Sequence, residues 1–173
     1  MKTGLIHIYC GDGKGKTTAS VGLAVRAAGA GKKVVFSQFF KNGTSSEIAN
    51  LKKLDGITTV HCPVHHGLYF RMNDEQKEKA KADYTALLEL ALEEAKDADL
   101  LILDEVISTF NYRVIPQARL LAFLQNKPSS LEVVMTGRNP DQRLLELADY
   151  VTEMKKIKHP FEEGVPARKG IEF

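Results

Sequence analysis

The sequence predicts an α/β fold in which a mostly parallel central sheet carries helices on both faces. Strand-like and helix-like segments alternate along the 173 residues, and this alternation is typical of a parallel sheet with crossover helices. Several strand segments are apolar throughout, as in residues 100–103, which indicates strands buried on both faces. A glycine-rich turn joins the first strand segment to the first helix segment.

Six segments have the length and composition of strands. They are residues 5–10, 34–40, 57–62, 100–104, 131–136 and 150–156. Helical patterns occupy residues 17–30, 45–54, 74–97, 116–125 and 140–148. The long third helix is the best defined, because Asn73 and Gln76 form a capping-box pattern before an apolar stripe with helical spacing.

Length and composition favour one domain in a reducing compartment. A chain of 173 residues can bury a core, and we expect residues 1–173 to form a single domain. Two cysteines, Cys10 and Cys62, imply no disulfide framework. No leader and no apolar run of about 20 residues is visible, and a net charge of +2 gives no reason to expect nucleic-acid or membrane partners. We therefore expect a cytoplasmic protein.

A phosphate-binding loop is predicted between the first strand and the first helix. Its residues are Gly11, Asp12, Gly13, Lys14, Gly15, Lys16, Thr17 and Thr18. Glycines let backbone N–H groups converge on an anion, and the helix N-terminus adds positive potential. Lys16 can reach phosphate oxygens and the Thr17 hydroxyl can ligate Mg²⁺ or Mn²⁺. The alternative interpretation is a glycine-rich turn with solvated lysines.

The loop departs from the usual Gly-x-x-x-x-Gly-Lys-Ser/Thr pattern. Counting back from Gly15 puts the first glycine at residue 10, where this chain has Cys10. The first glycine is Gly11, so the loop is one residue short. It can still hold a triphosphate, but the shortening predicts a pose unlike the usual one.

Two other strand ends place charged residues at the same edge of the sheet. Asp104 and Glu105 follow an apolar strand and can reach a metal ion bound by Thr17. Arg138 follows the fifth strand and can pair with a phosphate. An ordinary acidic strand end and a solvated arginine are the alternatives. Ligands of such sheets bind beyond the carboxyl ends of the strands, so we expect these residues near the loop.

The segment after the third strand combines histidines, a cysteine and aromatic residues. Residues 61–66 read His-Cys-Pro-Val-His-His; this spacing matches no strong zinc pattern, which favours solvated or packed histidines. Leu68, Tyr69 and Phe70 follow at the ligand edge, where such side chains either pack or cover a flat ligand.

Together these segments resemble the P-loop ATP:corrinoid adenosyltransferases, the family that adenosylates cobalamin and its precursors. The matching motifs are residues 11–18, 38–41, 103–105, 136–138, 148–154, 158–161 and 169–173. The resemblance implies a P-loop (RecA-like) domain. Residues 155–173 are basic, and composition alone favours a frayed terminus there. Because this segment carries two of the motifs, we predict a C-terminal strap near the site.

The resemblance also implies a reaction and its parts. Co(I) attacks the 5′ carbon of ATP, triphosphate leaves intact and a cobalt–carbon bond forms, in cobalamin biosynthesis or salvage. The nucleotide is expected to lie reversed in the shortened loop. Further expectations are a reductase that supplies Co(I), a homodimer, and aromatic side chains that displace the lower axial ligand of cobalt.

Roles carry over residue by residue. The catalytic residues are expected to be Lys16, Thr17 and Glu105. ATP is expected to bind to residues 11–18 and Arg138, and the metal ion to Thr17, Asp104 and Glu105. The corrinoid is expected to contact Leu68, Tyr69 and Phe70.

This chain departs from the family pattern at two places. The family usually has Phe and Trp where this chain has Leu68 and Phe70, and residues 42–47 lack an aromatic residue often found there. Two other functions therefore stay open. One is a small-molecule kinase or ATPase, and the other is a nucleotide-gated corrinoid-binding protein with little turnover.

Overall fold

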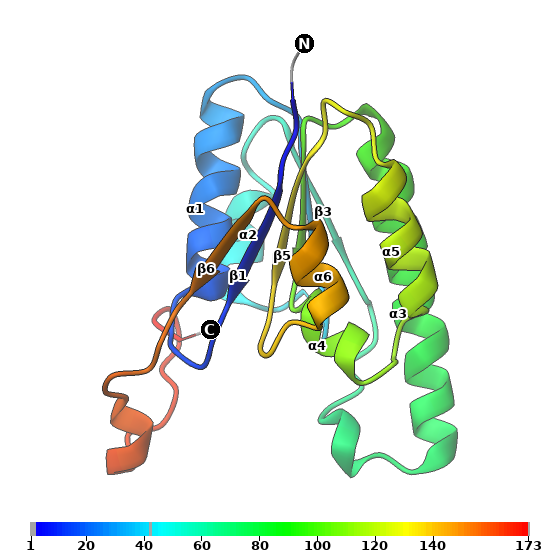
Figure 1. Ribbon diagram of the computed structural model, residues 1–173. Helices are drawn as coiled ribbons and strands as arrows, with labels where there is room; N and C mark the ends of the chain where they lie inside the picture. The colour runs from blue at the N-terminus through cyan, green and yellow to red at the C-terminus, as the bar shows by residue number, and fades with distance from the viewer. Residues whose placement is uncertain (1–2, 42, 173) are drawn as a thin grey trace.

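Apolar, β-branched runs form the centre of the molecule as a sheet of parallel strands (Figure 1). The computed structural model describes residues 3–41 and 43–172. Within them the strands are β1 (Ile6–Cys10), β2 (Val34–Gln38), β3 (Ile57–His61), β4 (Leu100–Asp104), β5 (Glu132–Thr136) and β6 (Tyr150–Glu153). The sheet has six strands in the order β3-β2-β4-β5-β1-β6, and every pair is parallel. The predicted fold class is confirmed.

Helices lie on both faces of this sheet. They are α1 (Lys16–Gly29), α2 (Ser46–Leu51), α3 (Asp74–Glu94), α4 (Val106–Asn111), α5 (Gln117–Asn126) and α6 (Gln142–Leu147). Short 3₁₀ segments occupy Tyr69–Arg71, Ala95–Asp97 and Pro160–Glu163. The expectations that concern Met1, Asn42 and Phe173 lie outside the described residues.

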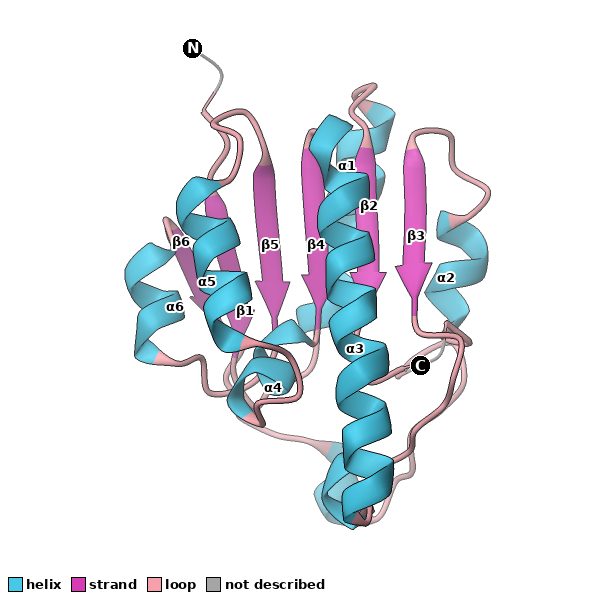
Figure 2. Cartoon of the chain, turned by 90° about the vertical axis from the view of Figure 1, so that its right-hand side faces the viewer, coloured by secondary structure: helices cyan, strands magenta, loops and turns pink. Residues whose placement is uncertain are grey.

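The two faces of the sheet have separate cores. Helices α1 and α2 cover one face, where Phe36 and Ile102 pack with side chains of both helices. Helices α3 to α6 cover the other face, where Val35 and Leu101 belong to the larger cluster (Figure 2). Neighbouring residues of one strand thus enter different cores, which is why β2, β4 and β5 each contain an unbroken apolar run.

The predicted elements differ from the observed ones mainly at their ends. The capping box of Asn73 and Gln76 is present, and the helix it starts ends as a 3₁₀ turn after Glu94. Helix α4 was not predicted, because it has six residues, follows a left-handed residue and has no side-chain cap. The sixth strand stops at Glu153, because β1 itself ends at Cys10 and the carbonyl of the next residue, Met154, accepts from the glycine loop at Gly13 N–H.

None of the helices among the described residues has both the length and the apolar composition to cross a membrane.

Candidate active site

The carboxyl ends of the parallel strands meet at one edge of the sheet, which is the lower edge in Figure 2. Asp104 is the last residue of β4, Gln38 of β2 and Thr136 of β5. The glycine loop leaves β1 at the same edge and enters α1 at Lys16. The register therefore brings together residues that are distant in the sequence, as expected for ligand sites of such sheets.

Asp104 is fully buried and accepts hydrogen bonds from three side chains. Thr17 Oγ1 donates to Asp104 Oδ1 at 2.9 Å, and Thr136 Oγ1 donates to the same oxygen at 2.7 Å. Gln38 Nε2 donates to Asp104 Oδ2 at 3.2 Å. A buried carboxylate is costly unless its oxygens are paired, so this network fixes the Thr17 hydroxyl over the end of β4.

Gln38 has a buried polar atom that no described residue satisfies. Its Nε2 is shared between Asp104 and Glu47, at 3.2 and 3.1 Å, so its Oε1 must point elsewhere. That Oε1 is buried and has no hydrogen-bond partner among residues 3–41 and 43–172. The Thr17 hydroxyl and the carboxylates offer only oxygen atoms, which are the ligands that Mg²⁺ prefers. The site fits a hydrated Mg²⁺ ion, whose water could donate to Gln38 Oε1.

Glu105 adopts a left-handed backbone conformation, with φ 61°. This sharp turn between β4 and α4 is held at two points. The Glu105 N–H donates to Thr136 Oγ1 at 2.8 Å, and Ser108 Oγ donates to Glu105 Oε2 at 2.9 Å. A non-glycine residue with positive φ is strained and persists where its surroundings fix it. The turn takes the backbone at Glu105 out of the path of β4 and into α4.

The glycine loop packs against the residue after β6. Gly13 N–H donates to Met154 O at 2.6 Å, and Met154 N–H donates to Cys10 O at 2.8 Å. A Cβ at Gly11 or Gly13 would lie 2.4 or 2.6 Å from Met154 O. These two glycines are therefore required for close packing of backbone on backbone, a reason that the phosphate-loop motif alone does not give.

Lys16 is buried beneath the loop and its Nζ donates to Gly13 O at 2.8 Å. Burial lowers the pKa of the Lys16 ammonium, and the nearby Glu105 partly opposes this. Within the described part of the chain, no carboxylate lies at hydrogen-bond distance from Lys16 Nζ. A lysine in such a confined site attracts a phosphate group strongly.

Cavities of about 400 Å³ flank the loop on two sides. One lies between α1, α2 and the end of the chain, and its lining includes Thr17, Thr18, Lys41 and Glu47. The lining of the other consists of Asp12, Arg138, Lys156, His159, Phe161 and Glu162. An extended ligand held at the loop therefore has space in both directions, and a nucleotide fits with its ribose on either side of the loop.

The C-terminal segment contacts the loop at two points. Lys156 N–H donates to Asp12 Oδ1 at 2.9 Å, and this hydrogen bond lowers the pKa of the Asp12 carboxyl. Lys14 Nζ donates to Glu172 Oε1 at 3.0 Å. Arg168 and Lys14 lower the pKa of the Glu172 carboxyl to about 2. The end of the chain thus lies beside the first turn of α1.

The predicted corrinoid residues divide into two kinds. Leu68 and Phe70 are 54% and 70% exposed. Tyr69 is partly buried, and its ring lies 6.3 Å from that of Phe40 and 6.2 Å from that of Tyr112. The structure thus places one of the three in an aromatic group beside the end of β2 and leaves the other two pointing to solvent.

Sequence reasoning gave no role to four residues of this region. Gln38 and Thr136 were visible as polar residues that end apolar strands at the ligand edge. Phe40 and Tyr112 carried no such signal, because their approach to Tyr69 depends on the left-handed backbone of Phe40, with φ 54°, and on the unpredicted α4.

The comparison with known families agrees with this geometry. The sequence profile of the family described as "ATP:corrinoid adenosyltransferase BtuR/CobO/CobP" matches residues 2–173. The chain belongs to this family. The resemblance found in the sequence is confirmed.

Curated relatives match nearly the whole of this chain and more than four fifths of their own length. A protein of Pseudomonas aeruginosa named "Corrinoid adenosyltransferase" is 34% identical over 171 residues, which cover 98% of this chain and 84% of that protein. The protein of the same name from Escherichia coli K12 is 33% identical over 172 residues, covering 98% and 86%.

Solved structures support the fold alone. ATPases 2 and 3 of EssC from Geobacillus thermodenitrificans align with a TM-score of 0.52 and 15% identity, covering 96% of this chain and 35% of that one. The cytoplasmic domain of EssC aligns with a TM-score of 0.54, 15% identity and the same coverage. This chain therefore spans about a third of each of these proteins, and its helices and sheet follow the fold of that part of EssC.

Proposed function

We propose that this protein transfers the 5′-deoxyadenosyl group of ATP to the Co(I) centre of a corrinoid and releases triphosphate. The observation that carries the proposal is the shortened loop above the Thr17–Asp104–Thr136 hydrogen-bond network, in a chain that matches the adenosyltransferase profile over residues 2–173.

The transfer needs no general base. The electron pair of Co(I) forms the bond to the 5′ carbon of ATP. The bond from that carbon to the α-phosphate oxygen breaks, and triphosphate leaves with the electron pair of that bond. Because the nucleophile carries no proton, the protein has to align two substrates and stabilise the departing charge.

Several cations of the loop are available for the triphosphate. Lys16 is buried and can turn from Gly13 O to a phosphate oxygen. Lys14 and Arg138 are exposed on the flanks of the loop. Thr18 is exposed at the start of α1, where backbone N–H groups lack helical partners. Donors placed in advance at a developing anion contribute through electrostatic stabilisation.

Thr17, Asp104 and Glu105 would hold the Mg²⁺ or Mn²⁺ ion, on the oxygen ligands described above. When bound, this ion supplies positive charge to the triphosphate. Asp104 keeps Thr17 in position, and the backbone turn at Glu105 sets the direction of the second carboxylate.

A reversed nucleotide accounts for the missing loop residue. In the usual pose the terminal phosphoryl group faces the strand end that carries Asp104. Reversal would instead turn the 5′ carbon toward the end of β2, where Phe40, Tyr69 and Tyr112 form an aromatic group. Aromatic rings are suited to a flat, apolar macrocycle. Leu68 and Phe70 are exposed beside them, and they are our candidates for contact with the lower face of the corrinoid.

Incubation with ATP, Mg²⁺ and chemically reduced cobalamin tests the proposal. We expect the visible spectrum of an alkylcobalt product together with one equivalent of triphosphate. Formation of ADP would instead identify a kinase or ATPase. Binding of both substrates without product would identify a nucleotide-gated binding protein.

Further parts of the proposal concern partners and context. A reductase supplies the electron for Co(I), and a coupled assay with a reductant tests this supply. The active protein is a cytoplasmic homodimer, and sedimentation with and without corrinoid tests the dimer. Residues 155–173 act as a strap beside the nucleotide.

A further inference from the structure

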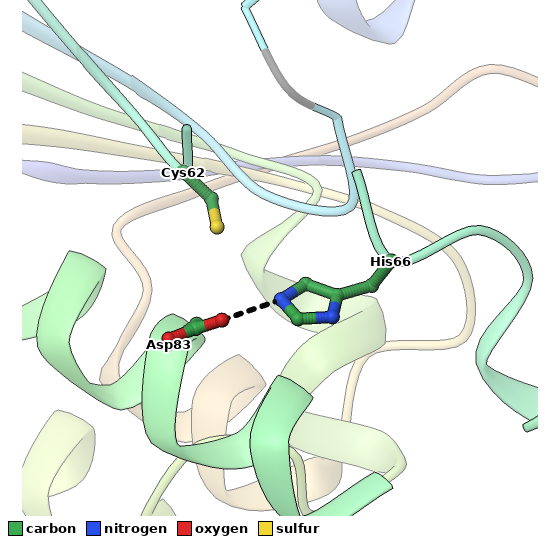
Figure 3. A group of neighbouring side chains, drawn as sticks. All are labelled: Cys62, His66 and Asp83. Atoms are coloured by element: carbon green, nitrogen blue, oxygen red, sulfur yellow. Dashed lines mark hydrogen bonds and ion pairs between the residues drawn. The ribbon is translucent and has the colours of Figure 1, made fainter. Parts of the chain in front are cut away.

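A second group of metal-ligating side chains lies outside the nucleotide site. Cys62 follows β3, His66 lies four residues later in the loop, and Asp83 comes from α3 (Figure 3). One ligand atom from each residue lies within 4.8 Å of the others. His66 Nε2 is 2.8 Å from Asp83 Oδ2. The spacing of residues 61–66 gave no zinc pattern, because the third residue is distant in the sequence and reaches the loop only through the packing of α3.

The three side chains converge on a mostly buried point. Cys62 is 2% exposed, and the side chains of His66 and Asp83 are 7% and 33% exposed. In Figure 3 the Asp83 carboxylate points toward the imidazole of His66, and the Cys62 side chain points toward the same pair. The partly exposed carboxylate leaves one side open to water, so a fourth ligand can come from solvent.

A backbone donor faces the sulfur of the cysteine. The Val64 N–H donates a hydrogen bond to Cys62 Sγ. A donor two residues after a cysteine stabilises the negative sulfur in a bound state, as outer-shell hydrogen bonds do at metal sites. The ring of His66 is held in place by Tyr84, at a centroid distance of 5.5 Å.

We propose that Cys62, His66 and Asp83 bind a zinc-type divalent ion, with water as the fourth ligand. One thiolate, one imidazole and one carboxylate match the borderline-soft ligands that Zn²⁺ takes in tetrahedral sites. With bonds of about 2.0–2.3 Å, neighbouring ligand atoms in such a site are about 3.3–3.6 Å apart. His66 Nε2 and Asp83 Oδ2 therefore need to separate by less than about 1 Å. As the ion binds, the thiol proton leaves to solvent, and the proton that His66 Nε2 donates to Asp83 moves to Nδ1.

Such an ion would connect the loop of residues 62–71 to α3. This loop carries the 3₁₀ turn Tyr69–Arg71 and the exposed Leu68. The metal site does not depend on the proposed transferase function, because none of its ligands contributes to the nucleotide site.

Titration with Co²⁺ as a spectroscopic probe, in the absence of ATP and corrinoid, tests the site. We expect one equivalent to bind with a thiolate-to-cobalt charge-transfer band and tetrahedral d–d bands, and Zn²⁺ to displace it. Zn²⁺ should also raise the midpoint of thermal unfolding.

Matched variants distinguish this site from adventitious binding. Cys62→Ser should abolish the charge-transfer band, and Asp83→Asn, which keeps an oxygen acceptor for His66, should weaken Co²⁺ binding at least about 10-fold. Cys10→Ser, at the other cysteine, and His65→Gln, on the same loop, should bind like the wild type. Circular dichroism checks that each variant is folded, and Asp83→Asn provides the test if Cys62→Ser is not. Absence of the band in the wild-type protein, or binding unchanged in Asp83→Asn, would overturn the proposal.

Discussion

The glycine loop and the loop of residues 62–71 lie at the same edge of the sheet but are built in opposite ways. In the first loop, polar atoms around Asp104 are almost all paired, and Gly11 and Gly13 contact backbone at distances that leave no room for a side chain. The second loop instead exposes Leu68 and Phe70, while its Cys62, His66 and Tyr69 side chains contact the rest of the domain.

This difference indicates what each loop does before substrate arrives. A phosphate site gains from preorganised donors, because charge then develops against groups that are already oriented. An apolar surface gains from remaining open, because a large flat ligand buries it only on binding. Mutations in the first loop should therefore change reaction rate or stability, and mutations in the second should change the response to the corrinoid.

The largest expected effect is that of Lys16→Ala. Among the described residues its Nζ donates to Gly13 O alone. The protein should therefore stay folded, while adenosyl transfer falls by at least about 100-fold through loss of anion stabilisation. The assay is the rate of alkylcobalt formation, with Lys53→Ala, at the opposite edge of the sheet, as the control. Full activity in Lys16→Ala would refute the site assignment.

Next in size is the effect of Thr136→Val on stability. This change removes a donor to Asp104 and leaves the Glu105 N–H without its acceptor. We expect a loss of about 2 kcal/mol in the free energy of unfolding, measured by urea denaturation. Thr58→Val, at an exposed position of β3, should change stability by less than about 0.5 kcal/mol. Equal losses of stability in the two variants would show that the hydrogen bonds of Thr136 to Asp104 and Glu105 do not stabilise the fold.

Phe70→Ala should leave stability unchanged, because the ring is largely exposed. If this ring displaces the lower axial ligand, the variant should lose several-fold more activity with base-on cobalamin than with a corrinoid that lacks the lower base. The comparison needs kcat/KM for both substrates. Leu90→Ala, an exposed apolar residue of α3, serves as the control. Equal losses with the two corrinoids would remove the axial-ligand role.

The smallest effect concerns the tail. The pKa of the Glu172 carboxyl is lowered to about 2 by Arg168 and Lys14. A lowered carboxyl pKa means that the contact is fully formed above the ordinary range near 4.5 and is lost as the pH falls toward 2. Between pH 7 and 5 the tail should therefore stay docked in the wild type, measured by hydrogen exchange near Gly170.

Glu172→Gln should speed that exchange at both pH values. Glu163→Gln, which changes an exposed carboxylate of the same tail, should not. Exchange that is equally fast in all three proteins would show that the carboxylate does not hold the tail.

Much of this arrangement follows from local sequence patterns. The six strands, the long capped helix and the charged strand ends were all identified, because hydrophobic periodicity and capping are local properties. Helix α4 escaped, because its six residues include several β-branched ones and are helical only where tertiary packing buries Val106, Ile107 and Phe110. The contact of Asp83 with His66 also escaped, because nothing in a linear pattern relates a helix face to a loop 17 residues earlier.

The sequence by itself determined the fold class, the phosphate-binding loop and the family, because each depends on residue types at fixed short spacings. Only the tertiary structure decided that Gly11 and Gly13 also serve close packing on Met154, that Gln38 and Thr136 complete the Asp104 network, and that Tyr69 joins Phe40 and Tyr112. The physical reason is that these contacts depend on the register of parallel strands and on left-handed turns, and both are set by the packing of the whole sheet.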